Sequence, residues 1–164
     1  MKEGILMSYI TFLRHLVGDR KIILNATSVV IVNEKNEVLL QHRSDNHLWG
    51  LPGGLLELDE SIAECAIREV KEETNLDVEL SRFLGVFNNP LMRWRETDEA
   101  RVIAFAFSAK VVGGSLRVND SESLELAYFP FDQLPQIHSV DNLAAIKAYY
   151  KEPQVTVEGV KYHG

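Results

Sequence analysis

The chain has little cysteine, which limits the classes of protein to which it can belong. Its 164 residues contain one cysteine, Cys65, so no intrachain disulfide can form, and nothing in the cysteine usage indicates an oxidising compartment. Free cysteine usually packs as a small apolar residue, and we expect Cys65 to be buried. The first ten residues also lack the basic-then-apolar layout of a signal peptide. The sequence therefore predicts a cytoplasmic protein.

Long apolar runs and an excess of basic residues are also missing. No run approaches the roughly 20 apolar residues that cross a bilayer, so we expect no membrane partner. Lys and Arg number 17 against 24 Asp and Glu, a net charge of -7 at pH 7, which argues against a nucleic-acid polymer as partner because such proteins usually carry a basic stripe. A small anionic substrate that brings its own metal ion remains compatible with this negative net charge.

What the chain does contain is an alternation of β-branched runs and helical patterns. Helical spacing predicts helices over residues 8–17, 61–74 and 140–150. Apolar and β-branched runs predict strands at residues 22–24, 27–32, 38–43, 78–87, 101–112 and 125–129. We expect a hairpin with its turn near Lys35 and Asn36, and a long loop over residues 88–98.

This order of elements predicts an α+β fold with a mixed sheet. The length fits one domain over residues 1–164, in which residues 1–20 form an N-terminal helical extension. That extension is a candidate contact for a homodimer.

The central predicted helix carries three glutamates on one face. Glu69, Glu72 and Glu73 are spaced i, i+3 and i+4, which places them within an arc of roughly 100°. An adjoining face, expected to pack on the sheet, carries Ala63, Ala66, Ile67, Val70 and Thr74. Clustered carboxylates suit Mg²⁺ or Mn²⁺. A solvated acidic face is the simpler alternative, because like-charged pairs spaced i, i+4 destabilise a helix by only tenths of a kcal/mol.

The residues before this helix favour the metal interpretation. Gly53 and Gly54 let the backbone approach a phosphate or a metal closely. Glu57 and Glu60 add two carboxylates, or else favour the N-terminal end of the helix dipole. Arg68 reaches Glu64 or Glu72 at i±4, and we expect it to pair with a carboxylate there.

Together these residues resemble the box of the Nudix hydrolase family, which includes the MutT-like enzymes. The box is a glycine, five residues, a glutamate, seven residues, then Arg-Glu-apolar-any-Glu-Glu-any-Gly-apolar. Here it reads Gly54, Glu60, Arg68-Glu69-Val70, Glu72-Glu73 and Leu76, over 23 positions. The family's late glycine is Asn75 in this chain. Because Asn also adopts the left-handed conformation, the helix can still end there.

The resemblance implies an α/β/α sandwich around a central mixed sheet, with a divalent cation held by the box. It makes Glu69 and Glu73 the expected direct ligands of Mg²⁺, with Mn²⁺ as an alternative, and Glu72 the next candidate ligand. Glu57 and the carbonyl of Gly53 are further candidate ligands. With Arg68, the three helix glutamates form the expected catalytic group.

Outside the box the sequence offers fewer signals. The family places the catalytic base either on this helix or in a distant loop, where Glu122 and Glu125 are candidates; both could equally be surface carboxylates. Arg93, Trp94 and Arg95 fall in the expected loop 88–98 and offer a ring and two cations to a substrate, or else form an exposed hairpin tip. Arg43, beside His42 at a strand end, could contact the phosphates.

These observations predict Mg²⁺-dependent hydrolysis of a diphosphate bond in a nucleoside diphosphate derivative, of the ADP-ribose-like or nucleotide-sugar type. A house-cleaning nucleoside triphosphate pyrophosphohydrolase is the alternative, and no sequence feature chooses between the two. A non-catalytic nucleotide sensor is a further alternative, although sensors commonly lose the box glutamates that this chain retains. An isoprenoid diphosphate isomerase on the same fold is not favoured by the short chain.

Overall fold

The computed structural model describes residues 7–93 and 99–160. Within them, a five-stranded mixed sheet has the order β4-β1-β6-β5-β8, and a three-stranded antiparallel sheet has the order β3-β2-β7. Strand β1 runs parallel to β6, and β5 runs antiparallel to β6. The strands are β1 Ile22–Ile31, β2 Val38–Arg43, β3 Trp49–Gly50, β4 Gly53–Leu55, β5 Leu76–Arg93, β6 Glu99–Gly114, β7 Ser123–Phe129 and β8 Thr156–Val157.

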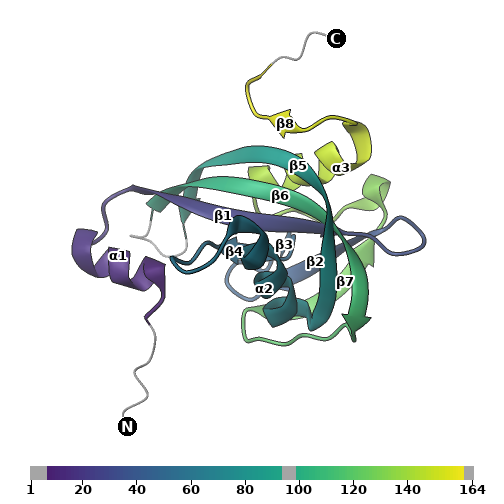
Figure 1. Cartoon of the computed structure of the whole chain (residues 1–164), viewed down its shortest axis with the longest axis horizontal. Helices are drawn as coiled ribbons and strands as arrows, with labels where there is room; N and C mark the ends of the chain where they lie inside the picture. The colour runs from purple at the N-terminus through teal and green to yellow at the C-terminus, as the bar shows by residue number, and fades with distance from the viewer. Residues whose placement is uncertain (1–6, 94–98, 161–164) are drawn as a thin grey trace.

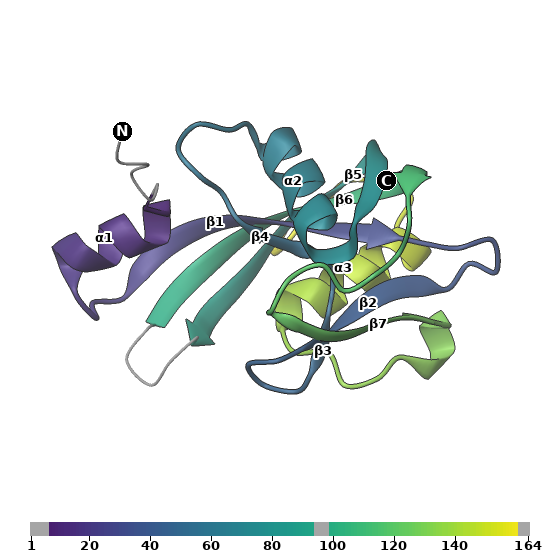
Figure 2. The same ribbon diagram turned by 90° about the horizontal axis from the view of Figure 1, so that it is seen from below.

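Two helices, α2 (Ile62–Thr74) and α3 (Val140–Lys151), lie on opposite faces of the larger sheet (Figures 1 and 2). Buried residues form one core between α2 and the sheet, around Val29 and Val70, and a second core that includes Val30 and Ile146 of α3. Successive residues of β1 thus face opposite layers, as the alternation of a strand requires. The arrangement is the predicted α/β/α sandwich with a mixed sheet.

Local signals set both ends of α2. Ser61 accepts a hydrogen bond from the Glu64 N–H, and the Glu64 carboxylate accepts one from the Ser61 N–H, which is a complete capping box. At the other end Asn75 is left-handed, with φ 62°, and its N–H donates to the Lys71 carbonyl. The prediction that Asn75 ends the helix in place of glycine is confirmed.

The buried face of α2 differs from the predicted one. Ala66, Val70 and Thr74 are buried as expected, but Ala63 and Ile67 are exposed. Cys65 and Glu73 are buried instead. Compared with the prediction, the buried face is therefore shifted around the helix axis. The side that carries Glu73 turns toward the sheet, and the side that carries Ala63 and Ile67 turns toward solvent. Cys65 meets the expectation of a small buried residue.

Three predictions about the strands need correction. The two runs at residues 22–24 and 27–32 form the one strand β1, joined through Asn25 and Ala26. The turn near Lys35 and Asn36 is present, but the flanking strands diverge into different sheets and share only the isolated bridge Val32–Val38. Residues 88–93 are not a loop, because β5 continues to Arg93 and pairs with β6, with an irregularity between Asn89 and Met92.

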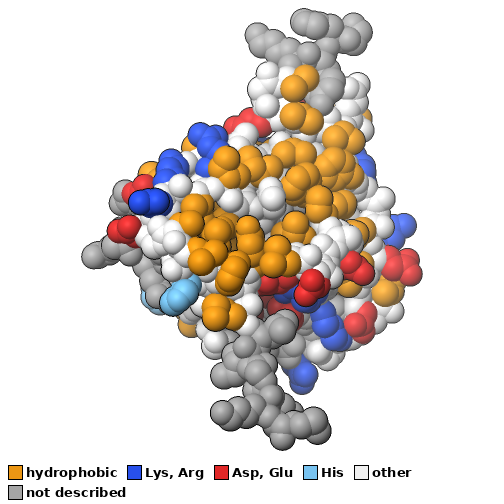
Figure 3. Space-filling model, turned by 60° about the vertical axis from the view of Figure 1, so that its left-hand side comes forward, with side chains coloured by type: hydrophobic (Ala, Val, Ile, Leu, Met, Phe, Trp, Pro, Cys, Tyr) orange, Lys and Arg blue, Asp and Glu red, His pale blue; other side chains and the backbone are white. Residues whose placement is uncertain are grey.

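The N-terminal segment forms α1 (Tyr9–Val17), as predicted, between the N-cap Ser8 and Gly18. Hydrophobic side chains gather on the face that appears when the left-hand side of Figure 1, which carries α1, is turned forward (Figure 3). Exposed apolar residues at this end of the chain include Phe12, Leu16 and Ile23. Among the described residues, no helix is long and apolar enough to cross a bilayer.

The left-handed cap gives a test of the end of α2. We expect Asn75→Ala to lower the free energy of unfolding by about 1–2 kcal/mol, because a Cβ residue other than Asn resists this conformation. Asn75→Gly should stay within about 0.5 kcal/mol of the wild type, since the relief of backbone strain offsets the lost bond from Asn75 Nδ2 to the Ser115 carbonyl. Urea unfolding of both variants measures the difference, and equal stabilities would contradict the assignment.

Candidate functional site

The acidic edge of α2 forms part of the wall of a large cavity of about 1190 Å³. Glu69, Glu72 and Glu73 all line it, but their exposure differs. The side chain of Glu72 is 55% exposed and that of Glu69 is 15% exposed, while Glu73 is 3% exposed. The predicted clustering of the three carboxylates is therefore observed, graded from solvent to the interior.

Glu73 lies at the buried end of this series. Its Oε2 accepts a hydrogen bond of 2.9 Å from the Gly53 N–H. Burial raises the pKa of Glu73 well above its usual range, and repulsion from Glu69 adds to the effect. Gly53 thus approaches the site through its N–H, whereas the predicted role of its carbonyl as a metal ligand stays a prediction.

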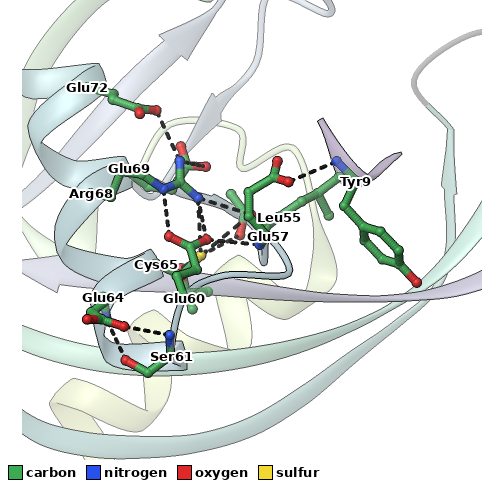
Figure 4. A network of polar contacts seen from close by, with 12 residues as sticks. Tyr9, Leu55, Glu57, Glu60, Ser61, Glu64, Cys65, Arg68, Glu69 and Glu72 are labelled. Carbon is green, nitrogen blue, oxygen red and sulfur yellow. Dashed lines mark hydrogen bonds and ion pairs between the residues drawn. The ribbon is translucent and has the colours of Figure 1, made fainter. Parts of the chain in front are cut away.

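Arg68 joins the carboxylates of the box into one network (Figure 4). Its guanidinium donates two hydrogen bonds to Glu60, at 2.6 and 2.7 Å, and others to Glu69 at 2.9 Å and Glu72 at 3.1 Å. The hydrogen bonds from Arg68 lower the pKa of Glu60 to about 2. The predicted pairing with Glu72 is confirmed; Glu64 is occupied by the capping box.

Glu69 lies between Arg68 and the interior of the cavity. Burial, with smaller contributions from the charges of Glu72 and Glu122, raises the pKa of Glu69 to about 7 against the opposing effect of Arg68. A carboxylate balanced near neutrality can either hold a cation or accept a proton.

A second acidic segment meets α2 in the cavity. Asp120 and Glu122, in the loop before β7, offer carboxylate oxygens that lie with one of Glu73 within 4.8 Å of one another. All three donors are hard oxygens, which fit Mg²⁺ or Mn²⁺ and not a soft metal. Glu122, which the sequence offered as a candidate base, therefore lies beside the box glutamate Glu73. Asp120 was not among the predicted site residues, although its spacing of two residues from Glu122 could have suggested it. Glu125 pairs with His42 in the β2–β7 ladder and does not line the cavity.

Gln41, which sequence reasoning missed, connects the two acidic segments. Its side chain is buried and lies on β2. Gln41 Oε1 accepts a hydrogen bond of 2.7 Å from Ser123 Oγ, next to Glu122, and the amide also bonds to the Glu73 carboxylate. A buried amide with donors and an acceptor can hold both groups. Nothing in the sequence distinguishes this glutamine from a surface residue of a half-exposed strand.

Two further predicted residues line the cavity. Arg43, the last residue of β2, forms two hydrogen bonds to Asp45, at 2.8 and 3.0 Å. Its neighbour His42 stacks on Trp49 at 4.8 Å and does not line the cavity. Glu57 lines it from the loop before α2, and its Oε2 accepts a hydrogen bond of 2.8 Å from the Tyr9 N–H of α1.

The remaining substrate-binding candidates are placed only in part. Arg93 is the last residue of β5, paired with Glu99 of β6, so it belongs to a strand and not to the predicted loop. Trp94 and Arg95 lie outside the described residues.

The start of α3 contributes a polar group that the sequence did not reveal. His138, Asp141 and Asn142 line the cavity. Burial, with the nearby charge of Arg43, lowers the pKa of His138 to about 4, so the ring is neutral at pH 7. Asp141 is 4% exposed, and its Oδ1 has no hydrogen-bond partner within the described part of the chain. From sequence, Asp141 reads as an ordinary acidic residue in the first turn of a helix.

The sequence of the chain is similar to those of known proteins. Residues 23–150 match the sequence model of the NUDIX domain. The chain is 33% identical over 124 residues to a protein named ADP-ribose pyrophosphatase from Methanocaldococcus jannaschii, covering 74% of this chain and 70% of that protein. It is 34% identical over 107 residues to a putative 8-oxo-dGTP diphosphatase from Bacillus subtilis, covering 65% and 66%.

The fold is also similar to those of solved structures with related names. A MutT protein from Methanosarcina mazei Go1 is similar with a TM-score of 0.65 and 28% identity, covering 81% of this chain and 96% of that one. An ADP-ribose pyrophosphatase from Streptococcus suis has a TM-score of 0.63 at 28% identity, with the same coverage.

The two glycines of the site provide a matched test. A Cβ on Gly54 would meet the carboxylate of Glu69, which is the movable end of a side chain, whereas a Cβ on Gly53 would meet the backbone of Thr27 and Ser28. We expect Gly54→Ala to weaken Mn²⁺ binding about tenfold or more while unfolding free energy changes by less than about 1 kcal/mol. Gly53→Ala should cost about 2 kcal/mol or more of stability. Titration with Mn²⁺ and urea unfolding separate the two effects, and a Gly54→Ala chain with unchanged Mn²⁺ affinity would contradict the role of Glu69.

Proposed function

Because this chain belongs to the NUDIX domain family, we propose that it hydrolyses a diphosphate bond in a nucleoside diphosphate derivative, with Mg²⁺ or Mn²⁺, by attack of water at phosphorus. The relatives that it resembles bear the names of enzymes that cleave diphosphates. The chemistry of its own cavity supports the assignment.

One observation carries the proposal. Carboxylates from two segments distant in sequence, Glu69 and Glu73 on α2 and Asp120 and Glu122 before β7, converge in one cavity. Burying like charges together is unfavourable unless a cation compensates them. A solvated acidic face, the simpler alternative, would not bury Glu73 or bring a second loop to it. The geometry therefore supports a bound divalent cation.

The residues take distinct roles in this proposal. A bound divalent cation neutralises phosphate oxygens and lowers the pKa of water. Glu73, Asp120 and Glu122 would hold it, with Glu69, Glu72 and Glu57 as further ligands. Arg68 fixes the rotamer of Glu69 through their hydrogen bond. Arg43 faces the cavity and would contact a phosphate oxygen.

Of Glu122 and Glu69, the carboxylate that does not bind the cation would take the proton from the attacking water. Glu122 is exposed at the cavity edge and belongs to the acidic trio. Glu69 has a pKa raised to about 7 by burial, which suits proton acceptance near neutral pH. Comparison of the pH–rate profiles of Glu122→Gln and Glu69→Gln assigns the role, since only loss of the base removes the acidic limb of the profile.

The polar end of the cavity at α3 supports a nucleoside as one half of the substrate. The unpartnered Oδ1 of Asp141 is a buried acceptor, and such a group gains most from a ligand N–H. An amino-bearing nucleobase offers that donor. Neutral His138 beside it adds a polar edge without a charge.

Among substrate classes, we place ADP-ribose-like and nucleotide-sugar compounds first, and nucleoside triphosphates as the alternative. A non-catalytic sensor would bind such compounds without turnover. The expected partner is thus a small nucleotide; a homodimer through α1 stays a prediction that sedimentation would test.

Removal of the buried ligand and of the metal tests the mechanism. A panel of ADP-ribose, nucleotide sugars and nucleoside triphosphates should be turned over with Mg²⁺ and not after chelation. Glu73→Gln should lower kcat about 100-fold or more, because it removes the negative charge of a proposed ligand of the cation. Glu79→Gln, an exposed glutamate of β5, serves as the control. Full activity of Glu73→Gln, or no turnover of any compound by the wild type, would refute the proposal.

Base recognition has its own test. Wild type should prefer an adenosine diphosphate derivative over its purine riboside counterpart, which lacks the amino group, by about tenfold in kcat/KM. Asp141→Ala, which removes the acceptor, should abolish this preference, while Asp132→Ala, at an exposed aspartate in the short 3-10 helix Phe131–Gln133, should keep it. An unchanged preference in a folded Asp141→Ala chain would show that the base lies elsewhere.

A further inference from the structure

Helix α1 lies outside the part of the chain that the family accounts for. The NUDIX match begins at residue 23, after α1 (Tyr9–Val17) has ended. The helix has nine residues and none of them is buried. Isolated helices of this length are marginal in water, so contacts with the rest of the chain must hold it.

Two polar anchors provide these contacts. At its start, the Tyr9 N–H donates to Glu57 Oε2 at 2.8 Å, where the partial positive charge of a helix N-terminus also favours a carboxylate. In its last turn, Arg14 donates to the Glu99 carbonyl at 2.9 Å and to the Arg20 carbonyl at 2.7 Å. The first anchor is a carboxylate of the catalytic cavity, and the second is the start of β6. The helix is thereby fixed across one end of the site.

The same end of the cavity is apolar. Tyr9, Ile10 and Phe12 of α1 line it together with Leu58 and Met92, and we call these five residues the α1 arm. Leu58 follows Glu57, and Met92 pairs with Ala100 next to the Arg14 anchor, so both lie near the helix. Phe12 is 47% exposed and Leu58 is 71% exposed. Apolar side chains in a cavity wall gain from a ligand that removes them from water.

The α1 arm and the α3 end flank the carboxylates. Helix α1 lies toward one end of the molecule, away from α2 and α3 (Figures 1 and 2), and residues of all three line one cavity. Along the segment before α2, the Leu51 N–H donates to Asn142 of α3 and the Gly53 N–H donates to Glu73, while Glu57 accepts from the Tyr9 N–H of α1, so Glu73 lies between the two ends. Its volume of about 1190 Å³ exceeds the range of about 300–1000 Å³ usual for one drug-sized ligand. A diphosphate centred on the carboxylates would direct one substituent toward each end.

We propose that the α1 arm is a second binding subsite, which receives an aromatic or otherwise apolar face of the group attached to the phosphate distant from the nucleoside. The inference rests on the proposed diphosphate hydrolysis and narrows its substrate class. A compound with a bulky group on both phosphates fills both ends. A nucleoside triphosphate, whose terminal phosphates carry no such group, leaves the α1 arm empty.

The attachment of the helix can be altered without changing its fold. Tyr9 is the first residue of α1, where proline is well tolerated, and Ser8 already has the extended backbone (ψ 151°) that a following proline requires. Tyr9→Pro therefore removes the N–H that bonds Glu57, and Tyr9→Ala keeps it. The ring of Tyr9 points away from the carboxylate network (Figure 4), and the pair separates the backbone bond from the side chain.

The experiment compares two substrates that differ only in the second group. Diadenosine diphosphate carries a second nucleoside, and the methyl ester of ADP carries a methyl group. The selectivity of each chain is its ratio of kcat/KM for the first over the second, and we expect about tenfold or more for the wild type. Phe12→Ala should reduce the ratio about fivefold. Leu16→Ala, exposed on the same helix and outside the cavity lining, should leave it unchanged.

Tyr9→Pro should reduce the ratio at least twofold below that of Tyr9→Ala, because the arm loses its anchor. Thermal melts confirm that each variant is folded. A wild type without selectivity, or an unchanged ratio in both Phe12→Ala and Tyr9→Pro, would overturn the subsite. If the wild type cleaves neither compound, the proposed hydrolysis fails, and the ratio of dissociation constants from calorimetry on the same chains still decides whether the α1 arm binds the second group.

Discussion

The site is built on carboxylates that the fold forces together and withdraws from water. Glu69 and Glu73 share one edge of α2, and the loop before β7 brings Asp120 and Glu122 to the same place. Repulsion and lost hydration both raise the pKa of Glu69 and Glu73. Only positive charge relieves this arrangement. Arg68 supplies part of it to Glu69, and a divalent cation would supply the remainder at Glu73.

Several features of the chain make room for these carboxylates or fix their orientation. Gly54 lacks a side chain where a Cβ would displace the Glu69 carboxylate, and Gly53 lies against the backbone of β1 so that its N–H reaches Glu73. The capping box at Ser61 and the left-handed Asn75 fix the length of α2 and therefore the direction of its glutamates. Gln41 holds the second acidic segment to the first. Changes at these positions should therefore alter metal binding even where the side chain itself does not contact the cation.

The two ends of the cavity offer one way in which a family scaffold could acquire a particular substrate. In the function proposed above, the carboxylates would act on the diphosphate, which is common to all its derivatives, whereas Asp141 at one end and the α1 arm at the other would contact the groups that differ. The α3 end belongs to the matched domain of residues 23–150, and α1 precedes it. A segment added before the domain can change the second group without disturbing the chemistry, because its contacts are with Glu57 and Glu99 at the edge of the site.

Much of this protein can be read from local sequence. The periodicity predicted α1, α2, α3 and most strands, and the spacing of Gly54, Arg68 and Glu73 identified the family, because helix period and capping depend on residues within a few positions of one another. Tertiary structure alone decided the rotation of α2 that buries Glu73 and exposes Ile67, the separation of β1 and β2 into two sheets, and the extension of β5 to Arg93. It also decided that Asp120, Asp141 and Tyr9 line one cavity and that the buried Gln41 bonds to Ser123 beside it. Such placements depend on contacts between segments tens of residues apart, and no local pattern of side chains encodes which distant partner will be buried against them.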